Sequence, residues 1–556
     1  MAAVRALVAA STVVLGGCYD GLGDHDGDLP DGAADSQGPA DGGEDGPGAE
    51  PPSDPEQVAP IGLRRLTAFE YDNTLRDLLL DETRASNLLL PEDLRTPFDN
   101  DYTLQVPSTA LIEAADLLAA DAASRLLADA QKRDTVVGCT PTGADDASCF
   151  ASFVSSFGRR AFRRPLTAEE LEGLTALQGE AIEAGDFYLG VESVIRTVLQ
   201  SPSFLYRVEL GQPVEGEPGL FRLTGYEVAT RLSYLLWGTL PSDALLDAAE
   251  AGELDTSEGI GAQLSGMLAD PRAVDRIARF HSLWMGYENL PHSYDIAQAM
   301  QEETRALMQR VIFDEQLAWQ DLLRMNETYI GPLLAEHYGL PAPDGDGPAW
   351  VPYGDSGRMG LFSQGSFLSL GTANGETSPV QRGLLVQTRL FCQDIPPPPP
   401  DLDVNVDEPP GDPATQCKSE RYAAHQVSGS SCNGCHAAID PIGFGLEAYD
   451  AAGRFREHDT DRPECPISGD GEIAGVGAFN GPKELAELAI ESGMLNRCVA
   501  TQLYRFAIGR YALDDLDENF LDAVSESIGE EDFRFDDLLR RFVTSDTFRF
   551  RRQEEN

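Results

Sequence analysis

The sequence predicts a mostly α-helical protein that is divided into several domains. Its 556 residues are enough for several domains with cores of their own. Thr67 and Glu70 have the spacing of a capping box, in which each side chain accepts the backbone N–H of the other residue at a helix start. Apolar residues follow at helical spacing, at Tyr71, Leu75, Leu78 and Leu79.

The same pattern returns in the second half of the chain. Thr224 and Glu227 form the same box, and residues 65–79 align with residues 222–236. A second pair of segments, 196–207 and 540–551, matches in the same order. Similar helix composition could explain the first match alone, but two ordered matches predict an internal duplication, with modules at about 65–209 and 222–552.

The first 18 residues predict export. Arg5 is the only charged residue before an apolar run that ends in Leu15-Gly16-Gly17-Cys18. The run is too short to cross a bilayer and is typical of a cleaved signal peptide. Small residues before a cysteine resemble a bacterial lipoprotein signal, in which Cys18 carries the lipid anchor. An ordinary secretory signal with a chance cysteine is the alternative.

Residues 19–58 predict a flexible acidic tether. They contain 12 Asp or Glu, nine Gly, six Pro and no Lys or Arg, a composition that cannot bury enough apolar surface to fold. The whole chain has a formal net charge of -52, which argues against nucleic acid and anionic lipid as partners. We therefore expect the chain to reach the membrane through its lipid anchor.

One short motif gives the strongest chemical signal, Cys432-Asn-Gly-Cys435-His436. Cys-x-x-Cys-His is the pattern of c-type haem attachment: each thiol reaches one vinyl group, and the adjacent imidazole becomes an axial ligand of the iron. A zinc knuckle would need a second ligand pair, and a thioredoxin-type dithiol would need a βαβ context. Since neither is present, we expect one haem c, bound through Cys432 and Cys435 and ligated by His436.

The segments around the motif complete the expected domain order. A proline run occupies 396–400, a short helix is predicted at 418–426, and two closing helices at 495–509 and 533–543. An irregular loop is expected after the motif, from Pro441, Gly443, Gly445 and Gly453. The predicted domains are the signal peptide (1–18), the tether (19–58), a helical module without haem (59–209), a helical domain opening module two (217–345), a helical and loop segment ending in polyproline (346–400), and a cytochrome c-like haem segment with closing helices (414–556).

Several stretches resemble one family of exported proteins. They are "SCNGCHAAIDPIGFGLEAYDAAGRFRE", "RGLLVQTRLFCQDIPPPPP", "CVATQLYRFAIGR", "RLTAFEYDNTLRDLL" and "FGRRAFRRPLTAEEL". They resemble planctomycete and myxobacterial proteins built from domains of unknown function 1587, 1595, 1592, 1588 and 1585. The resemblance extends over nearly all of the chain from Leu63 to Arg551 and implies a cytochrome c-like protein.

The sixth iron ligand is left open. Met494 lies 58 residues after His436, a placement that resembles the distal Met of small cytochromes c. His425 belongs to the family pattern, and it could ligate the iron, bond a haem propionate or cap the short helix. The third alternative is an open position or another ligand.

The remaining cysteines predict disulfides. The chain has nine cysteines, and six remain once Cys18, Cys432 and Cys435 are set aside, an even number that fits three bridges in an exported protein. Cys139 and Cys149 flank a short loop with Pro141 and Gly143, and we expect them to pair. The resemblance implies the other two bridges: Cys392 and Cys498 flank the haem segment in the family, which leaves Cys417–Cys465.

Other charged residues are expected to be structural. Arg159, Arg160, Arg163 and Arg164 form the densest basic cluster, and pairing with nearby carboxylates is favoured over an anion or propionate site. Carboxylates in loops usually are solvated or cap turns, and we expect this of three residues after the motif: Asp440, Glu447 and Asp450. The sequence has no GxSxG, HExxH or P-loop motif, so hydrolase and nucleotide chemistry lack support.

These observations predict an exported, membrane-anchored protein that transfers electrons through one haem c. Its partner would be a redox protein or a small electron carrier. One alternative is a haem-dependent or haem-fed oxidoreductase, such as a peroxidase, that acts on an exported substrate. Another is a structural cell-surface lipoprotein.

Overall fold

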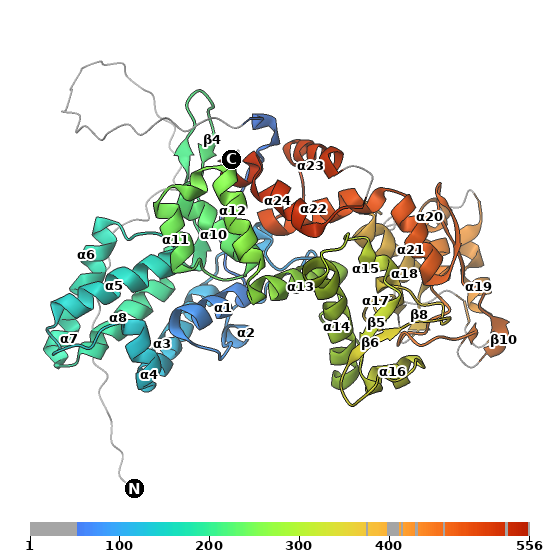
Figure 1. Cartoon of the computed structure of the whole chain (residues 1–556), viewed down its shortest axis with the longest axis horizontal. Helices are drawn as coiled ribbons and strands as arrows, with labels where there is room; N and C mark the ends of the chain where they lie inside the picture. The colour runs from blue at the N-terminus through green and yellow to red at the C-terminus, as the bar shows by residue number, and fades with distance from the viewer. Residues whose placement is uncertain are drawn as a thin grey trace, which may run out of the picture. The chain divides into compact units, whose positions relative to one another are not determined.

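The computed structural model of the protein describes residues 53–373, 376–396, 411–412, 415–428, 432–459, 462–528 and 532–553. The expected signal peptide with Cys18, most of the acidic tether and most of the proline run lie outside these residues. The described chain is mostly helical, as predicted (Figure 1). None of its helices is long and apolar enough to cross a membrane.

Module one is a set of helices between two short strands, β1 (Arg64–Arg65) and β2 (Tyr206–Arg207). The predicted capping box of Thr67 and Glu70 is present at the start of its first helix. Leu78, Leu79, Phe153 and Phe157 fill its core. The helices are α1 Ala68–Leu79, α2 Ser86–Leu89, α3 Thr109–Ala128, α4 Ala130–Val137, α5 Ala147–Phe162, α6 Ala168–Ala176, α7 Gln178–Ala184, α8 Phe187–Gln200 and α9 Pro202–Leu205.

Between the modules lies β3 (Gln212–Pro213), which pairs with β4 (Leu220–Arg222) at the start of module two. Module two continues through helices and small antiparallel hairpins. The first part contains α10 Gly225–Leu236, α11 Asp243–Glu250, α12 Ser257–Leu268, α13 Pro271–Met285, α14 Tyr294–Gln309, α15 Asp321–Arg324, β5 Glu327–Ile330, α16 Pro332–Tyr338, β6 Ala349–Pro352, α17 Gly365–Leu368, β7 Thr372–Ala373, β8 Glu376–Thr377 and α18 Pro379–Leu385. A second capping box, of Thr224 and Glu227, starts α10 as predicted.

The rest of module two includes the Cys-x-x-Cys-His motif and the chain end. It contains α19 Lys418–Arg421, a 3-10 turn Tyr422–Gln426, α20 Asn433–Phe444, β9 His458–Asp459, β10 Arg462–Pro466, β11 Asp470–Ile473, β12 Gly477–Asn480, α21 Gly481–Glu491, α22 Met494–Ile508, α23 Asp515–Ile528, α24 Phe535–Val543, α25 Asp546–Arg549 and β13 Phe550–Arg552. The predicted helix 418–426 is therefore α19 followed by the 3-10 turn, and the closing helices 495–509 and 533–543 correspond to α22 and α24.

In each module, a strand near the beginning pairs with a strand at the end. In module one β1 pairs with β2, and Arg65 lies opposite Tyr206. In module two β4 pairs with β13, and Arg222 lies opposite Phe550. These are the partners that the two aligned sequence pairs make equivalent. The next residue also matches: the backbone N–H of Leu66 donates to the Leu205 carbonyl at 2.8 Å, and that of Leu223 donates to the Arg549 carbonyl at 2.9 Å. The aligned pairs thus pack equivalently, as a duplication predicts.

The main hydrophobic core joins the modules rather than belonging to one of them. Most of its residues come from module two, but Ile61 and Phe98 enter from the N-terminal side. Conversely, Tyr234 and Leu240 of module two pack in the module-one core. Burying apolar surface across this boundary stabilises the two modules together.

The folded part begins earlier than predicted. Residues 53–58 were expected in the tether, but Val58 is buried with Val214, Leu220 and Phe550, and Pro60 forms a bridge with Arg552. The C-terminal strand supplies backbone and apolar partners that composition alone does not reveal. The tether prediction is therefore wrong for residues 53–58.

The predicted loop after the motif is wrong over residues 437–444, because this segment belongs to α20 with Pro441 inside it. The helix lies against α18 (Figure 1). An added Cβ at Gly443 would lie 1.8 Å from the Pro379 carbonyl oxygen, and one at Gly383 would lie 1.9 Å from that of Ile439. The two helices pack so closely that only glycine fits at these positions. Gly443 therefore marks a contact between two backbones and not a loop.

Candidate functional site

The Cys-x-x-Cys-His motif lies at the start of α20. Cys432 directly precedes this helix, and Cys435 and His436 lie in its first turn. Both cysteines are free and partly buried. Gly434 between them is exposed, and an added Cβ there would meet no atom within 4 Å. The backbone between the two cysteines is therefore exposed, and no other described residue covers its outer side.

A buried carboxylate holds the histidine of the motif. Nδ1 of His436 donates to Oδ1 of Asp440 at 2.8 Å, one helical turn away. Nδ1 of His425, in the 3-10 turn, donates to the other oxygen of Asp440 at 3.1 Å. The Asp440 side chain is 0% exposed, whereas both imidazoles are partly exposed. Since both Nδ1 atoms are engaged, Nε2 is the nitrogen that each ring has left for a metal.

Asp440 is ionised at neutral pH. Burial, the strongest influence, would raise the pKa of this carboxyl, but the hydrogen bonds from His425 and His436 outweigh it and hold the pKa below the usual value. The prediction of a solvated or capping role for Asp440 is therefore wrong. It assumed a loop, whereas α20 carries this side chain inward beside both histidines.

The structure brings one of the two predicted sixth ligands to His436. The rings of His425 and His436 have centroids 3.9 Å apart and are tilted by 40°. Two imidazoles on opposite sides of an iron would be about 6 Å apart, for metal–nitrogen bonds of about 2 Å. His425 thus lies beside His436 and not across a metal from it. Met494 packs against the main core and is not among the described contacts of His436.

Glu447, a second carboxylate that was expected to be solvated, is also buried, and that prediction is wrong. Its carboxylate accepts hydrogen bonds from Thr377, Lys418, Arg382 and Arg456. Burial would raise its pKa, but the three cations outweigh this and lower it. Asp450 does cap a turn as predicted, because it accepts the backbone N–H groups of the residues at 452 and 454.

The basic cluster of module one is mostly paired, as predicted. Three members pair with carboxylates: Arg159 with Asp247, Arg160 with Asp243 and Arg164 with Glu170. Arg163 instead donates to carbonyl oxygens at the end of module one, those of Ser203, Phe204 and Tyr206. This cluster therefore joins elements of the fold.

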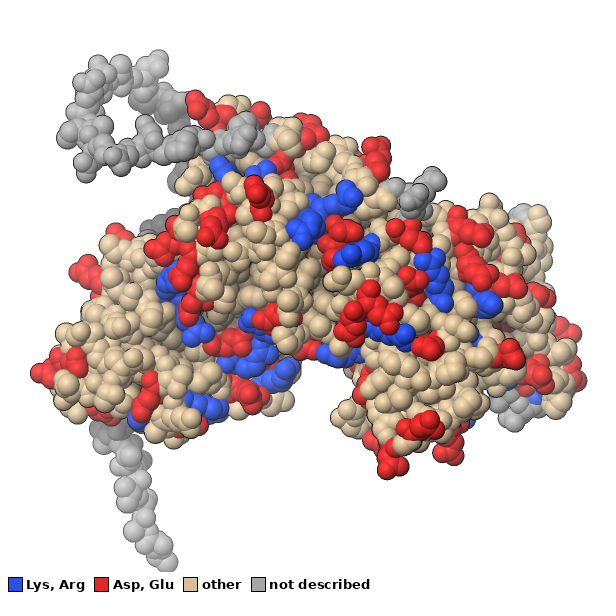
Figure 2. All heavy atoms as spheres, in the orientation of Figure 1, with Lys and Arg blue, Asp and Glu red and all other residues tan. Residues whose placement is uncertain are grey.

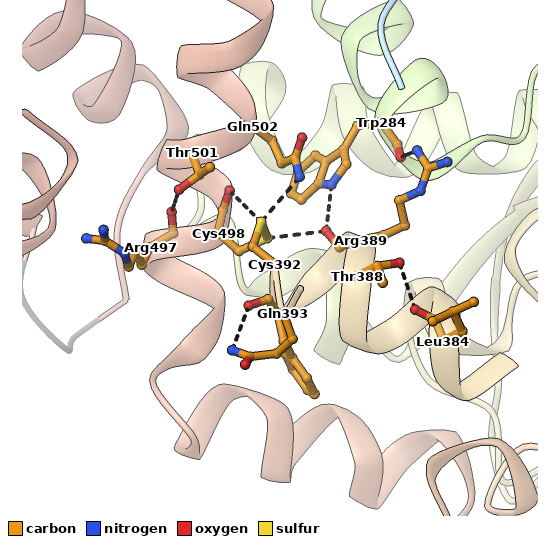
Figure 3. The surroundings of a disulfide bond; sticks show 11 residues. Trp284, Leu384, Thr388, Arg389, Cys392, Gln393, Arg497, Cys498, Thr501 and Gln502 are labelled. Carbon is orange, nitrogen blue, oxygen red and sulfur yellow. Dashed lines mark hydrogen bonds between the residues drawn. A yellow bond between two sulfur atoms is a disulfide. The ribbon is translucent and has the colours of Figure 1, made fainter. Parts of the chain in front are cut away.

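Three disulfides lie outside the motif: Cys139–Cys149, Cys392–Cys498 and Cys417–Cys465. They are the three pairs that the sequence analysis expects, and they are consistent with an exported protein. Cys392–Cys498 joins the segment after α18 to α22 (Figure 3). Close to it, Nε1 of Trp284 donates to the Arg389 carbonyl at 2.7 Å, and Gln502 contacts Cys392 (Figure 3).

Five family models match the chain in succession. They describe proteins of unknown function: DUF1587 at residues 64–128, DUF1595 at 149–209, DUF1592 at 223–340, DUF1588 at 358–459 and DUF1585 at 477–548. Together they are the planctomycete domain set predicted from the sequence. The chain belongs to the family that carries this set. Its DUF1588 domain, a cytochrome-like domain, contains both cysteines of the motif, both histidines and Asp440. Searches of curated proteins and of solved structures found no match.

The donors of this cytochrome-like domain fit a covalently bound haem. Two free thiols three positions apart suit two thioether bonds, and Nε2 of the adjacent His436 has no hydrogen bond within the described part of the chain. The buried Asp440 supplies the hydrogen bond that commonly orients a metal-ligating histidine.

Proposed function

We propose that the chain is an exported electron carrier with one haem c, attached to Cys432 and Cys435 and ligated by His436. One observation carries the proposal. Among the described cysteines, six are in disulfides and only these two are free. In an oxidising compartment, two thiols at this spacing would be expected to pair with each other or to be kept for another bond. The adjacent histidine favours thioether bonds to haem.

The residues of the chain have distinct roles in this proposal. Cys432 and Cys435 fix the cofactor, and His436 presents Nε2 to its iron. Asp440 holds the His436 ring in one tautomer and makes it a more basic ligand. The bound haem would supply one-electron transfer, to and from a redox protein or a small electron carrier.

Haem attachment is tested in a host that has the haem c maturation machinery. The wild-type protein should give a haem-stained band after denaturing electrophoresis, because thioether bonds survive denaturation. Cys432→Ser combined with Cys435→Ser should abolish the band. Cys139→Ser combined with Cys149→Ser is the matched control, since it removes another cysteine pair and should keep the haem. A wild-type protein without haem in such a host would overturn the proposal.

The proposal includes a lipid anchor on Cys18, supported by the short apolar run and the small residues before this cysteine. Labelling with a fatty-acid probe should require Cys18, and Cys18→Ala should leave the protein unprocessed or released from the membrane. Equal labelling of the variant and the wild type would contradict the anchor. The haem proposal does not depend on this result.

A haem-dependent oxidoreductase is the second candidate. It is favoured by the place of Met494 against the main core and by the place of His425 beside His436. An iron with an open sixth position binds small ligands, whereas a fully ligated iron resists them. Carbon monoxide should change the spectrum of the reduced protein if this candidate is correct, and an unchanged spectrum favours the electron carrier.

A further inference from the structure

A cavity of about 590 Å³ lies mainly in the cytochrome-like domain and has an unusual charge for this chain. Five basic side chains line it: Lys418, Arg421, Arg454, Arg456 and Arg462. Three carboxylates accompany them, those of Glu376, Asp450 and Asp459, so the lining has an excess of two positive charges. Glu447 behind the lining pairs with Lys418 and Arg456 and reduces this excess to one. The chain as a whole has a net charge of -52. Acidic and basic side chains are interspersed over the face drawn in Figure 2, so a local positive excess differs from the charge of the chain as a whole.

One of these cations, Lys418, forms all its hydrogen bonds with other residues of the chain. Nζ of Lys418 has three donors, and it donates to the carbonyl and the hydroxyl of Thr377 and to Glu447. Its hydrogen-bonding capacity is therefore fully used. Lys418 contributes charge to the cavity but has no donor left for a ligand.

Arg421 is a second cation of the lining that is held by the fold. Its Nη2 donates to Glu376 at 2.8 Å. Its Nε and Nη1 are buried and have no hydrogen-bond partner in the described part of the chain, and the residue is only 6% exposed. A ligand in the cavity cannot reach these two buried nitrogens, so Arg421 contributes charge to the cavity rather than free donors.

Arg454 presents accessible donors to the cavity. Its Nε donates to Oδ2 of Asp450 at 2.9 Å, and its backbone N–H donates to Oδ1 at 2.9 Å. Asp450 therefore fixes the inner part of the side chain. The two terminal nitrogens have no hydrogen bond among the described residues, and the side chain is 58% exposed. A guanidinium edge of this kind binds a carboxylate or another oxoanion through two parallel hydrogen bonds.

We propose that this cavity binds a small hydroxylated organic anion, such as a sugar acid. Arg454 binds the anionic group, Arg421 adds positive charge, and the carboxylate of Asp459 accepts hydrogen bonds from hydroxyl groups. The volume is typical of a site for a small organic molecule and is larger than a lone phosphate or sulfate requires. The three carboxylates of the lining disfavour a ligand with several negative charges. The proposal does not depend on haem attachment.

Calorimetric titration of the full exported protein at low ionic strength tests this site with four probes. Galacturonate carries a carboxylate and hydroxyls, galactose carries hydroxyls alone, and phosphate and sulfate are oxoanions alone. We expect galacturonate to bind at least tenfold more tightly than each of the others, since hydrogen bonds to charged groups change binding by about tenfold or more. Absence of galacturonate binding, or equal binding of any other probe, would overturn the proposal.

Variants locate the binding in the cavity. Arg454→Gln should weaken galacturonate binding about tenfold, and Arg454→Lys, which keeps the charge but loses the planar edge, should weaken it less. Arg324→Gln, on α15 and outside the cavity lining, is the matched control and should bind as the wild type does. The Cys432→Ser and Cys435→Ser double variant should also bind normally. Equal affinity of Arg454→Gln and the wild type, with both folded by circular dichroism, would rule the site out.

Discussion

His436 and Asp440 lie one turn apart on α20, and Nδ1 of His436 donates to the buried carboxylate at 2.8 Å. The carboxylate is ionised, because the two histidines that donate to it hold its pKa below the usual value against the effect of burial. It therefore determines which nitrogen of His436 is protonated and in which direction the other nitrogen points. The motif supplies the ligand, and a residue four positions later fixes its orientation.

Asp440→Asn should alter the redox properties of a protein that has haem attached. The neutral amide makes His436 a weaker electron donor, so the reduction potential should rise, and the haem content should fall as the ring loses its fixed orientation. A spectroscopic redox titration gives both quantities. Asp450→Asn removes one charge from the same domain without touching either histidine and should leave the potential unchanged. An unaltered potential in Asp440→Asn would contradict this role.

Glu209→Gln should destabilise the joint between the two modules. The Glu209 side chain is 6% exposed and pairs with Arg64 of module one and with Arg231 of module two. Burial would raise its pKa, but the charges of Arg231 and Arg64 outweigh burial and lower it to about 2. Removing one partner from a buried ion pair costs about 3–5 kcal/mol. Urea unfolding should report this loss, while the exposed control Glu215→Gln should stay within about 0.5 kcal/mol of the wild type.

The lowered pKa of Glu209 predicts that its contribution to stability depends on pH. A carboxyl whose pKa is lower in the folded state stabilises the fold above its unfolded pKa, near 4.5 for Glu209, and this contribution is lost as the pH falls toward 2. The difference in stability between wild type and Glu209→Gln should therefore narrow between pH 4.5 and pH 2. A constant difference over this range would show that the charge of Glu209 is not responsible.

The buried carboxyl of Glu303 predicts the opposite pH dependence, a stability that falls as the pH rises. It is 0% exposed, accepts hydrogen bonds from Thr328 and Tyr338, and burial raises its pKa to about 7. The folded state then holds a proton that the unfolded state releases above pH 4.5, so this group lowers stability as the pH rises from 4.5 to 7, by up to about 3 kcal/mol. Glu303→Gln should flatten that decline in urea unfolding at pH 5 and pH 7. The adjacent exposed Glu302→Gln should keep it, and a decline retained in Glu303→Gln would reject the assignment.

Short sequence patterns predicted the features of the fold that depend on residues close together in the chain. Both capping boxes start helices because Thr67 and Thr224 each satisfy a backbone donor three residues ahead. The aligned segments that begin at Arg65 and Arg222 also pair in the same register, with partners from the second aligned pair of segments. The motif itself is a local pattern, so Cys432, Cys435 and His436 could be selected without a structure.

The predictions that failed concern residues whose environment depends on contacts between distant parts of the chain. Pro441 and Gly443 indicate a loop by composition, yet close packing of α20 on α18 makes the segment helical. Once that segment is treated as a loop, the i, i+4 relationship of His436 and Asp440 cannot be seen. Glu447 was missed for a related reason, since its cations come from three separate segments: Arg382, Lys418 and Arg456.

The Cys392–Cys498 disulfide should contribute more stability than Cys139–Cys149. It joins residues 106 positions apart, whereas the other bridge joins residues 10 apart, and a longer closed loop restricts the unfolded chain more. Replacing Cys392 and Cys498 by alanine should cost about 4–5 kcal/mol, and replacing Cys139 and Cys149 should cost about 3 kcal/mol or less. Urea unfolding of both double variants under non-reducing conditions measures the difference. An equal or reversed order would mean that native contacts around Trp284 and Gln502 (Figure 3), and not loop closure, set the contribution of this bridge.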